Sequence, residues 1–290
     1  MPSSPRSAAA PTDTDPRLTD LIERVQANPK YAHIAPELVR SLAQAALAQT
    51  GSTKSAFKAT RGKLHQVAGA YFRRKPTYAA WLTQLRAAPE QTPPAAVRDI
   101  CRRMMESHAS TRERLPILDR FYPTLLHDLP PVQSVLDLAC GLNPLAIPWM
   151  PLAPKARYIA TDIYSDLATF LSKAIPLLGV RGHGSVLDLL HQPPSGAYDV
   201  VLLLKAFPCL EQLQPGLPQR LLQSTTAKTI LVSYPVSSLG GRAKGMADNY
   251  ARHFRRLALP DKSTVYEFRF ETELVYRITQ PQDSTALSVH

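Results

Sequence analysis

The stretch Ser134-Val-Leu-Asp-Leu-Ala-Cys-Gly-Leu-Asn-Pro-Leu145 decides how the rest of the chain is organised. Its first five residues are mostly valine and leucine, which predicts a short buried strand. Small residues end the run at Gly141, where the backbone can turn sharply and a ligand can approach closely. Asn143-Pro144 then favours the start of a helix, because proline suits the first helical position. The stretch predicts a strand, a turn and a helix, with a binding site at the turn.

A carboxylate follows at the spacing that nucleoside-binding folds use. A second apolar run, Tyr158-Ile-Ala160, leads to Asp162, which lies twenty-one residues after Gly141. In such folds the turn lies against the ligand, and the acid accepts hydrogen bonds from the ribose hydroxyls. Dinucleotide folds place three glycines in this turn, whereas this chain has one. We therefore expect a nucleoside without a pyrophosphate, such as S-adenosylmethionine.

Strands and helices alternate through the second half of the chain. The predicted strands cover residues 134–138, 158–160, 185–188, 199–204 and 229–233. Two further strand-like runs, 263–270 and 272–278, are joined by a very short turn and predict a hairpin. Alternation of this kind predicts an α/β fold with a doubly wound parallel sheet, whose sites lie at the carboxyl ends of the strands. A parallel sheet closed by such a hairpin is the Rossmann-like architecture of class I S-adenosylmethionine-dependent methyltransferases.

The first third of the chain has a different character. Residues 1–16 contain four prolines and no apolar periodicity, so we expect a disordered leader. Residues 17–105 show only helical patterns, which predicts an N-terminal helical domain. We expect the methyltransferase domain to cover residues 106–280, and residues 281–290 to form a tail without an assigned structure.

Basic residues are concentrated in the helical domain. The 290-residue chain has a net charge of +11, and between Glu37 and Glu90 it has nine basic residues and no acid. Lys54, Lys58 and Arg61 repeat at helical spacing, and Arg73-Arg74-Lys75 forms a cluster. A solvated helix face usually mixes both signs, whereas a stretch of one sign favours phosphates as partners. We therefore expect an RNA-binding surface here rather than a solvated face.

Composition excludes several other classes of protein. No apolar run is long enough to span a membrane, so we expect no membrane association. Three scattered cysteines suit a reducing cytosol, which predicts a cytoplasmic protein. The eight histidines show no paired metal spacing, and we expect no metal. We also expect a monomer.

The ends of later strands supply further candidates. Asp188 follows the third predicted strand and could accept a hydrogen bond from an adenine amino group. Either Asp162 or Asp188 alone could be a helix cap, but two acids at successive strand ends favour a ligand site. Lys205 and Glu211 follow the fourth strand, where they could form a structural ion pair or a reaction pocket.

A local motif lies just before the first strand. Ser110-x-x-Glu113 matches a capping box, which would explain both residues structurally. Arg112 lies between them and has no such explanation.

Four motifs in this order resemble one enzyme family. They are His108-Ala-Ser-Thr-Arg-Glu-Arg-Leu-Pro116, Asp137-Leu-Ala-Cys-Gly-Leu-Asn-Pro-Leu145, Lys205-Ala-Phe-Pro-Cys-Leu-Glu211 and Ser238-Leu-Gly-Gly-Arg-Ala-Lys-Gly-Met246. Together they resemble the aminoglycoside-resistance 16S ribosomal RNA methyltransferases, which methylate N7 of guanine 1405 in the decoding site. The resemblance covers roughly residues 17–280, including the helical domain.

The resemblance implies S-adenosylmethionine as cofactor, S-adenosylhomocysteine as product, and a role for each matching residue. Arg112 would bind the methionine carboxylate, Asp162 the ribose and Asp188 the adenine edge. The remaining cofactor contacts would come from Ala139, Gly141, Leu189 and Gln212. Lys205 and Glu211 would be the catalytic residues beside the target base. The RNA contacts would come from Lys54, Lys58, Arg61, Arg73, Arg74, Lys75, Arg242, Lys244 and Met246.

The implied reaction needs no general base, because guanine N7 carries a lone pair and no proton. The enzyme must mainly align N7 with the methyl group, and Glu211 could bind the Watson–Crick donors of a flipped guanine. The resemblance implies 16S rRNA in the assembled 30S subunit as partner and aminoglycoside resistance as outcome. The alternatives are a methyltransferase acting on a different RNA or rRNA position, and a non-catalytic RNA-binding relative.

Overall fold

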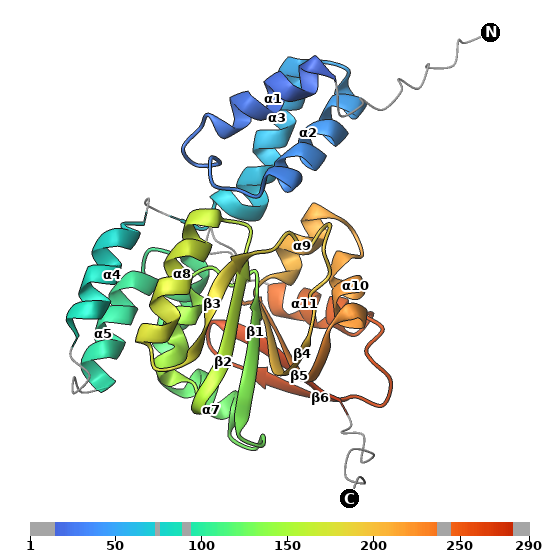
Figure 1. Ribbon diagram of the computed structural model, residues 1–290. Coiled ribbons are helices and arrows are strands. Elements are labelled where there is room, and N and C mark those ends of the chain that lie inside the picture. The colour runs from blue at the N-terminus through green and yellow to red at the C-terminus, as the bar shows by residue number, and fades with distance from the viewer. Residues whose placement is uncertain (1–14, 73–75, 89–93, 237–244, 281–290) are drawn as a thin grey trace, which may run out of the picture.

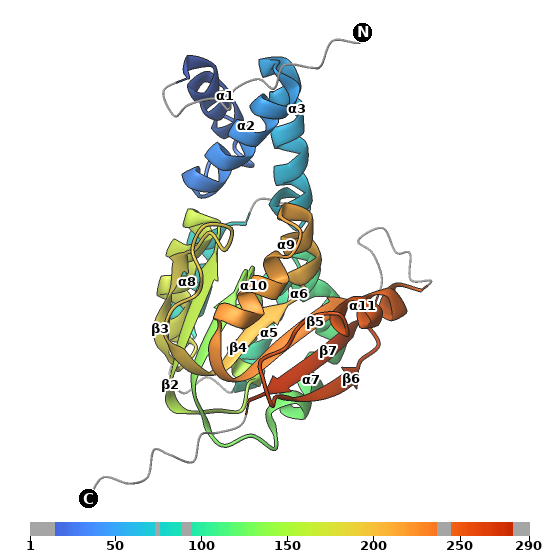
Figure 2. The same cartoon turned by 90° about the vertical axis from the view of Figure 1, so that its right-hand side faces the viewer.

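A bundle of helices stands on one edge of a mixed sheet (Figures 1 and 2). The structure is a computed structural model that describes residues 15–72, 76–88, 94–236 and 245–280. The bundle contains α1 (Pro16–Gln26), α2 (Pro36–Thr50) and α3 (Thr53–Leu64), and α3 continues into a π-helical turn, η1 (His65–Gly69). The predicted leader and tail lie outside the described residues, except that α1 already begins at Pro16.

In the described part of the chain, five helical segments lie between the bundle and the first strand of the sheet. They are α4 (Tyr78–Ala87), α5 (Pro94–Met105), α6 (Ala109–Arg114), the 3₁₀ turn η2 (Leu115–Ile117) and α7 (Leu118–Leu126). The helices after the first strand are the 3₁₀ helix η3 (Asn143–Trp149), α8 (Ser165–Leu177), α9 (Phe207–Leu213), α10 (Leu217–Ser224) and α11 (Met246–Phe254).

The sheet has the order β3-β2-β1-β4-β5-β7-β6 in the described residues. Its strands are β1 (Val132–Leu138), β2 (Leu152–Asp162), β3 (Arg181–Val186), β4 (Ala197–Leu204), β5 (Thr226–Pro235), β6 (Thr264–Arg269) and β7 (Glu273–Thr279). β1 to β5 pair in parallel, and β7 pairs antiparallel with both β5 and β6. The parallel sheet with a closing hairpin therefore confirms the class I methyltransferase fold.

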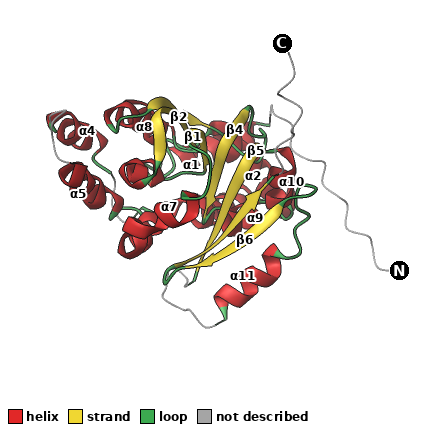
Figure 3. Cartoon of the chain, turned by 90° about the horizontal axis from the view of Figure 1, so that it is seen from below, coloured by secondary structure: helices red, strands yellow, loops and turns green. Residues whose placement is uncertain are grey.

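Helices cover both faces of this sheet (Figure 3). An apolar core lies on each face. Alternate side chains of β1 and β4 face opposite sides, as the strand period requires. One face packs against α4, α5, α7, η3 and α8, and the other against α9, α10 and α11. α4 and α5 lie within the range predicted for the helical domain, but their buried residues belong to the core on the first of these faces. The domain boundary at residue 105 stays a prediction.

The bundle has its own core and is joined to the carboxyl edge of the sheet. Its core residues pack partly against Ile163 and Tyr164, which follow β2. The backbone N–H of Ala35 donates to the Ile163 carbonyl over 2.8 Å, and that of Ser165 donates to the His33 carbonyl over 2.8 Å. The bundle is thus fixed directly above the edge where a ligand would bind.

The third strand begins earlier than the sequence predicts. β3 covers Arg181–Val186, so Leu187 and Asp188 of the predicted strand lie beyond it. Its Gly182 and Gly184 hide the strand pattern, because glycine is rare in strands unless another backbone approaches closely. A Cβ at Gly184 would lie 2.5 Å from the Ala168 carbonyl oxygen of α8, and one at Gly182 would lie 1.8 Å from the Tyr158 carbonyl oxygen. Close packing therefore requires both glycines.

Candidate cofactor and target-base site

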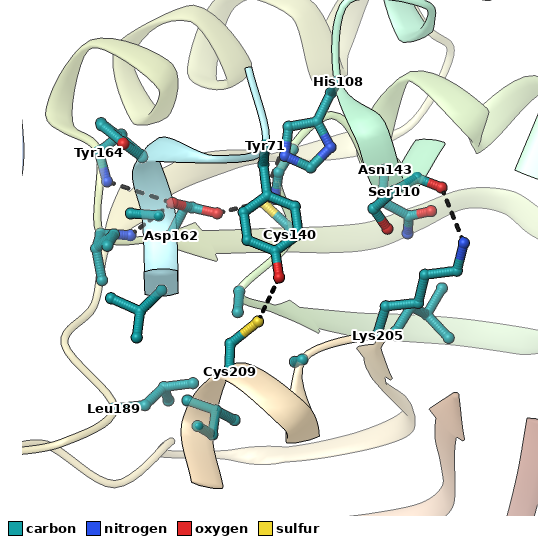
Figure 4. Close-up of a pocket in the computed structure, with 18 of the residues that line it drawn as sticks. Tyr71, His108, Ser110, Cys140, Asn143, Asp162, Tyr164, Leu189, Lys205 and Cys209 are labelled. Carbon is teal, nitrogen blue, oxygen red and sulfur yellow. Dashed lines mark hydrogen bonds between the residues drawn. The ribbon is translucent and has the colours of Figure 1, made fainter. Parts of the chain in front are cut away.

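A cavity of about 960 Å³, partly open to solvent, lies between the bundle and the carboxyl ends of the strands (Figure 4). Its floor includes the loops after β1, β2, β3 and β4. Its roof comes from the bundle and the segment after it, through Leu38, Val67, Ala68, Tyr71 and Phe72. The helical domain is therefore part of the binding site itself.

The turn after β1 requires its small residues. Ala139 and Gly141 both have positive φ, at 49° and 51°. A Cβ at Gly141 would lie 2.7 Å from Cε1 of His108, whose ring closes this side of the cavity. Glycine therefore satisfies both the backbone conformation and the close approach of the His108 ring.

The two predicted acids both line the cavity, and each is oriented by neighbouring groups. The Asp162 carboxylate accepts hydrogen bonds from the backbone N–H groups of Gly141 (2.8 Å) and Ile163 (2.8 Å). The Asp188 carboxylate accepts from the backbone N–H of Leu190 over 3.0 Å and lies 2.6 Å from Nδ1 of His191. A carboxylate has about four lone-pair sites, so each acid keeps acceptor capacity for a ligand. Burial raises the pKa of Asp162.

Three buried polar atoms in or near this cavity form no hydrogen bond with any residue that the structure describes. They are Nη1 of Arg112, Nδ1 of His108 and Oδ1 of Asp137. Buried polar groups normally have partners, so these atoms are candidates for contact with a ligand. His108 and Asp137 line the cavity, whereas Arg112 does not line it but is close enough to His108 to lower its pKa.

The electrostatic state of this cluster suits a zwitterionic ligand. Burial, with the cations Arg114, Lys205 and Arg112 nearby, lowers the pKa of His108 to about 3, so its ring is neutral. Burial raises the pKa of Asp137 to about 7, against the hydrogen bonds from Tyr158 and Asn143. A neutral ring, a free guanidinium nitrogen and a carboxylate acceptor match the carboxylate and ammonium groups of a bound methionine moiety.

A buried ion network lies beneath the cavity. Arg114 donates to both oxygens of Glu273 over 2.6 and 3.0 Å, and both side chains are fully buried. Lys205 has a positive φ of 57° and directs its ammonium to Glu113 (2.9 Å), the Ser110 carbonyl (3.3 Å) and Glu273 (3.5 Å). Burial opposes ionisation of Glu273, but Arg114 and Lys205 outweigh it and lower its pKa.

A second cavity adjoins the first. Four residues line both cavities and therefore mark where they meet: Tyr71, Ser110, Lys205 and Cys209. The hydroxyl of Tyr71 lies 2.6 Å from Sγ of Cys209 across this junction (Figure 4). The second cavity also contacts η1, Glu113, Gln212, Met246 and Tyr250.

Comparison with known proteins decides the family. The model of the family described as "Ribosomal RNA methyltransferase (FmrO)" matches residues 27–277. A protein of Micromonospora echinospora named 16S rRNA (guanine(1405)-N(7))-methyltransferase is 39% identical over 274 residues, covering 94% of this chain and 99% of the relative. A protein of the same name from Micromonospora rosea is 40% identical over 266 residues, covering 91% and 97%.

This chain belongs to the FmrO family of ribosomal RNA methyltransferases. Its fold agrees with the crystal structure of 16S rRNA methyltransferase RmtF in complex with S-adenosyl-L-homocysteine, with a TM-score of 0.74 and 30% identity over 92% of this chain and 99% of that one. The predicted family and enzyme class are therefore confirmed.

The methyltransferase brings most predicted cofactor residues to one cavity. Ala139, Gly141, Asp162, Asp188 and Leu189 all line it. Gln212 does not line this cavity; it borders the second cavity, and its carbonyl accepts a hydrogen bond from Lys63 over 2.6 Å.

The predicted pairing of Lys205 with Glu211 is replaced by other contacts. Lys205 pairs with Glu113 and Glu273, while the Glu211 carboxylate lies 3.2 Å from the backbone N–H of Gly216 and is not among the described residues lining either cavity. The capping-box interpretation is wrong, because His108 is the N-cap of α6 and Glu113 binds Lys205. The paired partners lie too far away in sequence for the motif to indicate them.

The predicted RNA-binding residues divide between three places. Lys54, Lys58 and Arg61 are exposed on α3 and line a hollow together with Lys30 and His65. Met246 begins α11 and lines the second cavity. Arg73, Arg74, Lys75, Arg242 and Lys244 lie outside the described residues.

The sequence analysis missed four residues of this site. Asp137 and His108 were quoted within motifs without a role, and Asn143 connects Arg114 with Asp137 through hydrogen bonds of 2.7 and 2.8 Å. Tyr71 was not singled out, and no pattern around it in the sequence indicated a role. In the described residues no helix is long and apolar enough to cross a membrane, and no group of three or more metal-ligating side chains occurs.

Proposed function

We propose that this chain transfers a methyl group from S-adenosylmethionine to N7 of guanine 1405 of 16S rRNA, and that it acts on the assembled 30S subunit. The modification would give resistance to aminoglycosides, because it places a fixed positive charge where these cationic drugs bind. The observation that carries the proposal is the cavity enclosed between the sheet and a helical domain with exposed cations of one sign. The curated relatives' names agree with this substrate.

The residues of the first cavity fit S-adenosylmethionine. Arg112 would bind the carboxylate of its methionine moiety, and the Asp137 carboxylate oxygen without a partner would accept from its ammonium. Asp162 would hold the ribose hydroxyls, and Asp188 would accept from the adenine amino group beside Leu189. When bound, the cofactor supplies an electrophilic methyl group on a sulfonium sulfur.

The chain's contribution to the transfer is alignment. Guanine N7 attacks with its lone pair and loses no proton, so no side chain must act as a base. Orientation of two reactants in one site contributes ~7–11 kcal/mol in well-ordered intramolecular reactions. Lys205 would fix the junction of the two cavities through Ser110 and Glu113, while the predicted catalytic role of Glu211 would require its carboxylate to leave Gly216.

The exposed cations of α3 would bind phosphates of the subunit. Lys54, Lys58 and Arg61 form no ion pair with a described residue, and the hollow that they line is open to solvent. Phosphate contacts of this kind position a protein on RNA without reading the base. The ribosome is a cytoplasmic partner, and a monomer would suffice because one chain contains both the cavity and the basic face.

The test is tritiated methyl transfer to purified 30S subunits and to naked 16S rRNA, followed by borohydride–aniline cleavage and primer extension. We expect a stop at guanine 1405 with 30S subunits and none with naked RNA. Labelling at another position would support a different rRNA target. Cofactor binding without any labelling would support a non-catalytic RNA-binding relative or another RNA.

A further inference from the structure

The second cavity contains one carboxylate whose role is unexplained by the cofactor site. Among the described residues that line this cavity, Glu113 is the only acid. Its side chain is 22% exposed, and its Oε2 accepts from the buried Lys205 ammonium over 2.9 Å. Within the described residues its Oε1 accepts no hydrogen bond, so that oxygen is available to a molecule in the cavity.

Lys205 holds this carboxylate in place. The ammonium also donates to the Ser110 carbonyl and forms an ion pair with Glu273 at 3.5 Å, so it is already surrounded by three oxygen atoms of the chain. Lys205 is therefore poorly suited to contact a base directly. It is well suited to orient Glu113, because its buried ammonium donates to one oxygen of that carboxylate and leaves the other oxygen toward the cavity.

The relative positions of the cavities decide which edge of a purine meets Glu113. Lys205, Ser110 and Tyr71 line both cavities, whereas Glu113 lines only the second one. A guanine at the junction that presents N7, on its Hoogsteen edge, to the cofactor cavity leaves its Watson–Crick edge, with N1–H and the N2 amino group, free for the second cavity. The aromatic rings of Tyr71 and Tyr250 and the side chain of Met246 supply surfaces for stacking there.

Guanine is the base whose Watson–Crick edge presents two adjacent donors. A carboxylate offers two adjacent acceptors and matches this edge, while adenine presents an acceptor at N1 beside its amino donor. We propose that Glu113 is the specificity-determining residue of this methyltransferase, accepting hydrogen bonds from N1–H and the N2 amino group of the target guanine. This inference rests on the proposed function. It assigns recognition of the guanine edge to Glu113, whereas the sequence predicted that Glu211 binds this edge.

The experiment compares methyl transfer to 30S subunits reconstituted with guanine or adenine at position 1405. The variant Glu113→Gln offers one acceptor and one donor, which matches adenine better than guanine. We expect its kcat/KM on guanine to fall about 100-fold, and its preference for guanine over adenine to narrow by at least about 10-fold, as loss of a bidentate base contact would produce. Cofactor affinity, measured by calorimetry, should remain within about 3-fold.

Two controls separate recognition from structure. Glu113→Asp keeps the charge for Lys205 but withdraws the carboxylate, so transfer should fall while the preference for guanine is kept. Glu211→Gln should leave the base preference unchanged; if it narrows the preference and Glu113→Gln does not, Glu211 is the recognition residue and the inference is wrong. An unchanged preference in Glu113→Gln with lowered activity would likewise overturn it and leave Glu113 a structural partner of Lys205.

A substrate-side measurement covers the case in which the Glu113 variants do not fold. Inosine at position 1405 lacks the N2 amino group but keeps N7 and N1–H. The wild-type enzyme should methylate these subunits about 10-fold less efficiently than guanine subunits. Equal rates would overturn the inference, whereas absence of transfer to guanine subunits would overturn the proposed function itself.

Discussion

Two regions of this molecule place their cations in opposite environments, one exposed and unpaired among the described residues, the other buried and paired. On α3, Lys54, Lys58 and Arg61 are exposed and have no carboxylate partner among the described residues. Below the cavity, Arg114 and Lys205 are buried and each contacts Glu273. A buried charge requires a partner within the protein, whereas an exposed charge is solvated by water and remains available to a binding partner. The pairing of a cation thus distinguishes a structural role from a binding role.

Removing a cation from the buried network should produce the largest effect on stability. Arg114→Met leaves the fully buried Glu273 with Lys205 as its one cationic partner among the described residues, and breaking a buried pair costs ~3–5 kcal/mol. Denaturant unfolding measures the change. The matched control is Arg120→Met, whose ion pair with Glu271 is more than half exposed on both sides, so its loss should leave the free energy of unfolding nearly unchanged. Equal losses in both variants would contradict the comparison.

The buried Asp137 predicts a pH-dependent stability of the same network. Its pKa is raised from 3.8 to about 7, so its contribution is fully present below pH 3.8, declines as the pH rises towards 7, and is constant above. Asp137→Asn should therefore raise the free energy of unfolding at pH 8 by at most on the order of 4 kcal/mol. Between pH 4 and 7, the free energy of unfolding of the Asp137→Asn variant should decline less than that of the wild type. An identical pH slope in both proteins would refute this.

Arg112 should behave like an exposed cation although it lies near the network. Its unpartnered Nη1 predicts that Arg112→Ala lowers affinity for S-adenosylhomocysteine about 10–100-fold, since a charged hydrogen bond contributes ~1.5–3 kcal/mol. The free energy of unfolding should change by less than ~1 kcal/mol. Calorimetry and denaturant unfolding measure the two quantities. Wild-type affinity in the variant would remove Arg112 from the cofactor site.

The smallest effect is expected for single cations on α3. Lys54→Glu or Lys58→Glu should weaken 30S binding and reduce the slope of log affinity against log salt by about 1. Cofactor affinity should not change, because neither side chain lines the cavity roof. The control is Lys173→Glu on the exposed side of α8. If the α3 variants leave the salt slope unchanged, these cations contact only solvent and do not bind the subunit.

The floor of the site could be predicted from the sequence because it is local. Gly141, Asp162 and Asp188 each follow an apolar run, and parallel strands bring their ends to one edge. β4 and β5 were recognisable as continuous apolar strands, whereas β3 was not, since its glycines respond to α8 and β2.

The roof and the ion network could not be predicted in this way. Tyr71 meets Cys209 across 138 residues of sequence, and Arg114 meets Glu273 across 159. Nothing in either local pattern specifies the partner. The motif around Ser110 suggested a helix cap because Glu113 has the right spacing, and only the fold shows that Lys205 competes for that carboxylate.

The shared roof also bears on how these proteins could be recombined. Leu38, Val67 and Tyr71 line the roof of a cavity whose other walls come from the sheet domain. Grafting the helical bundle of a relative onto this sheet would therefore alter cofactor affinity together with target choice. The bundle therefore cannot be exchanged by itself. A chimaera would have to keep the residues of the bundle that line the cavity together with the sheet domain.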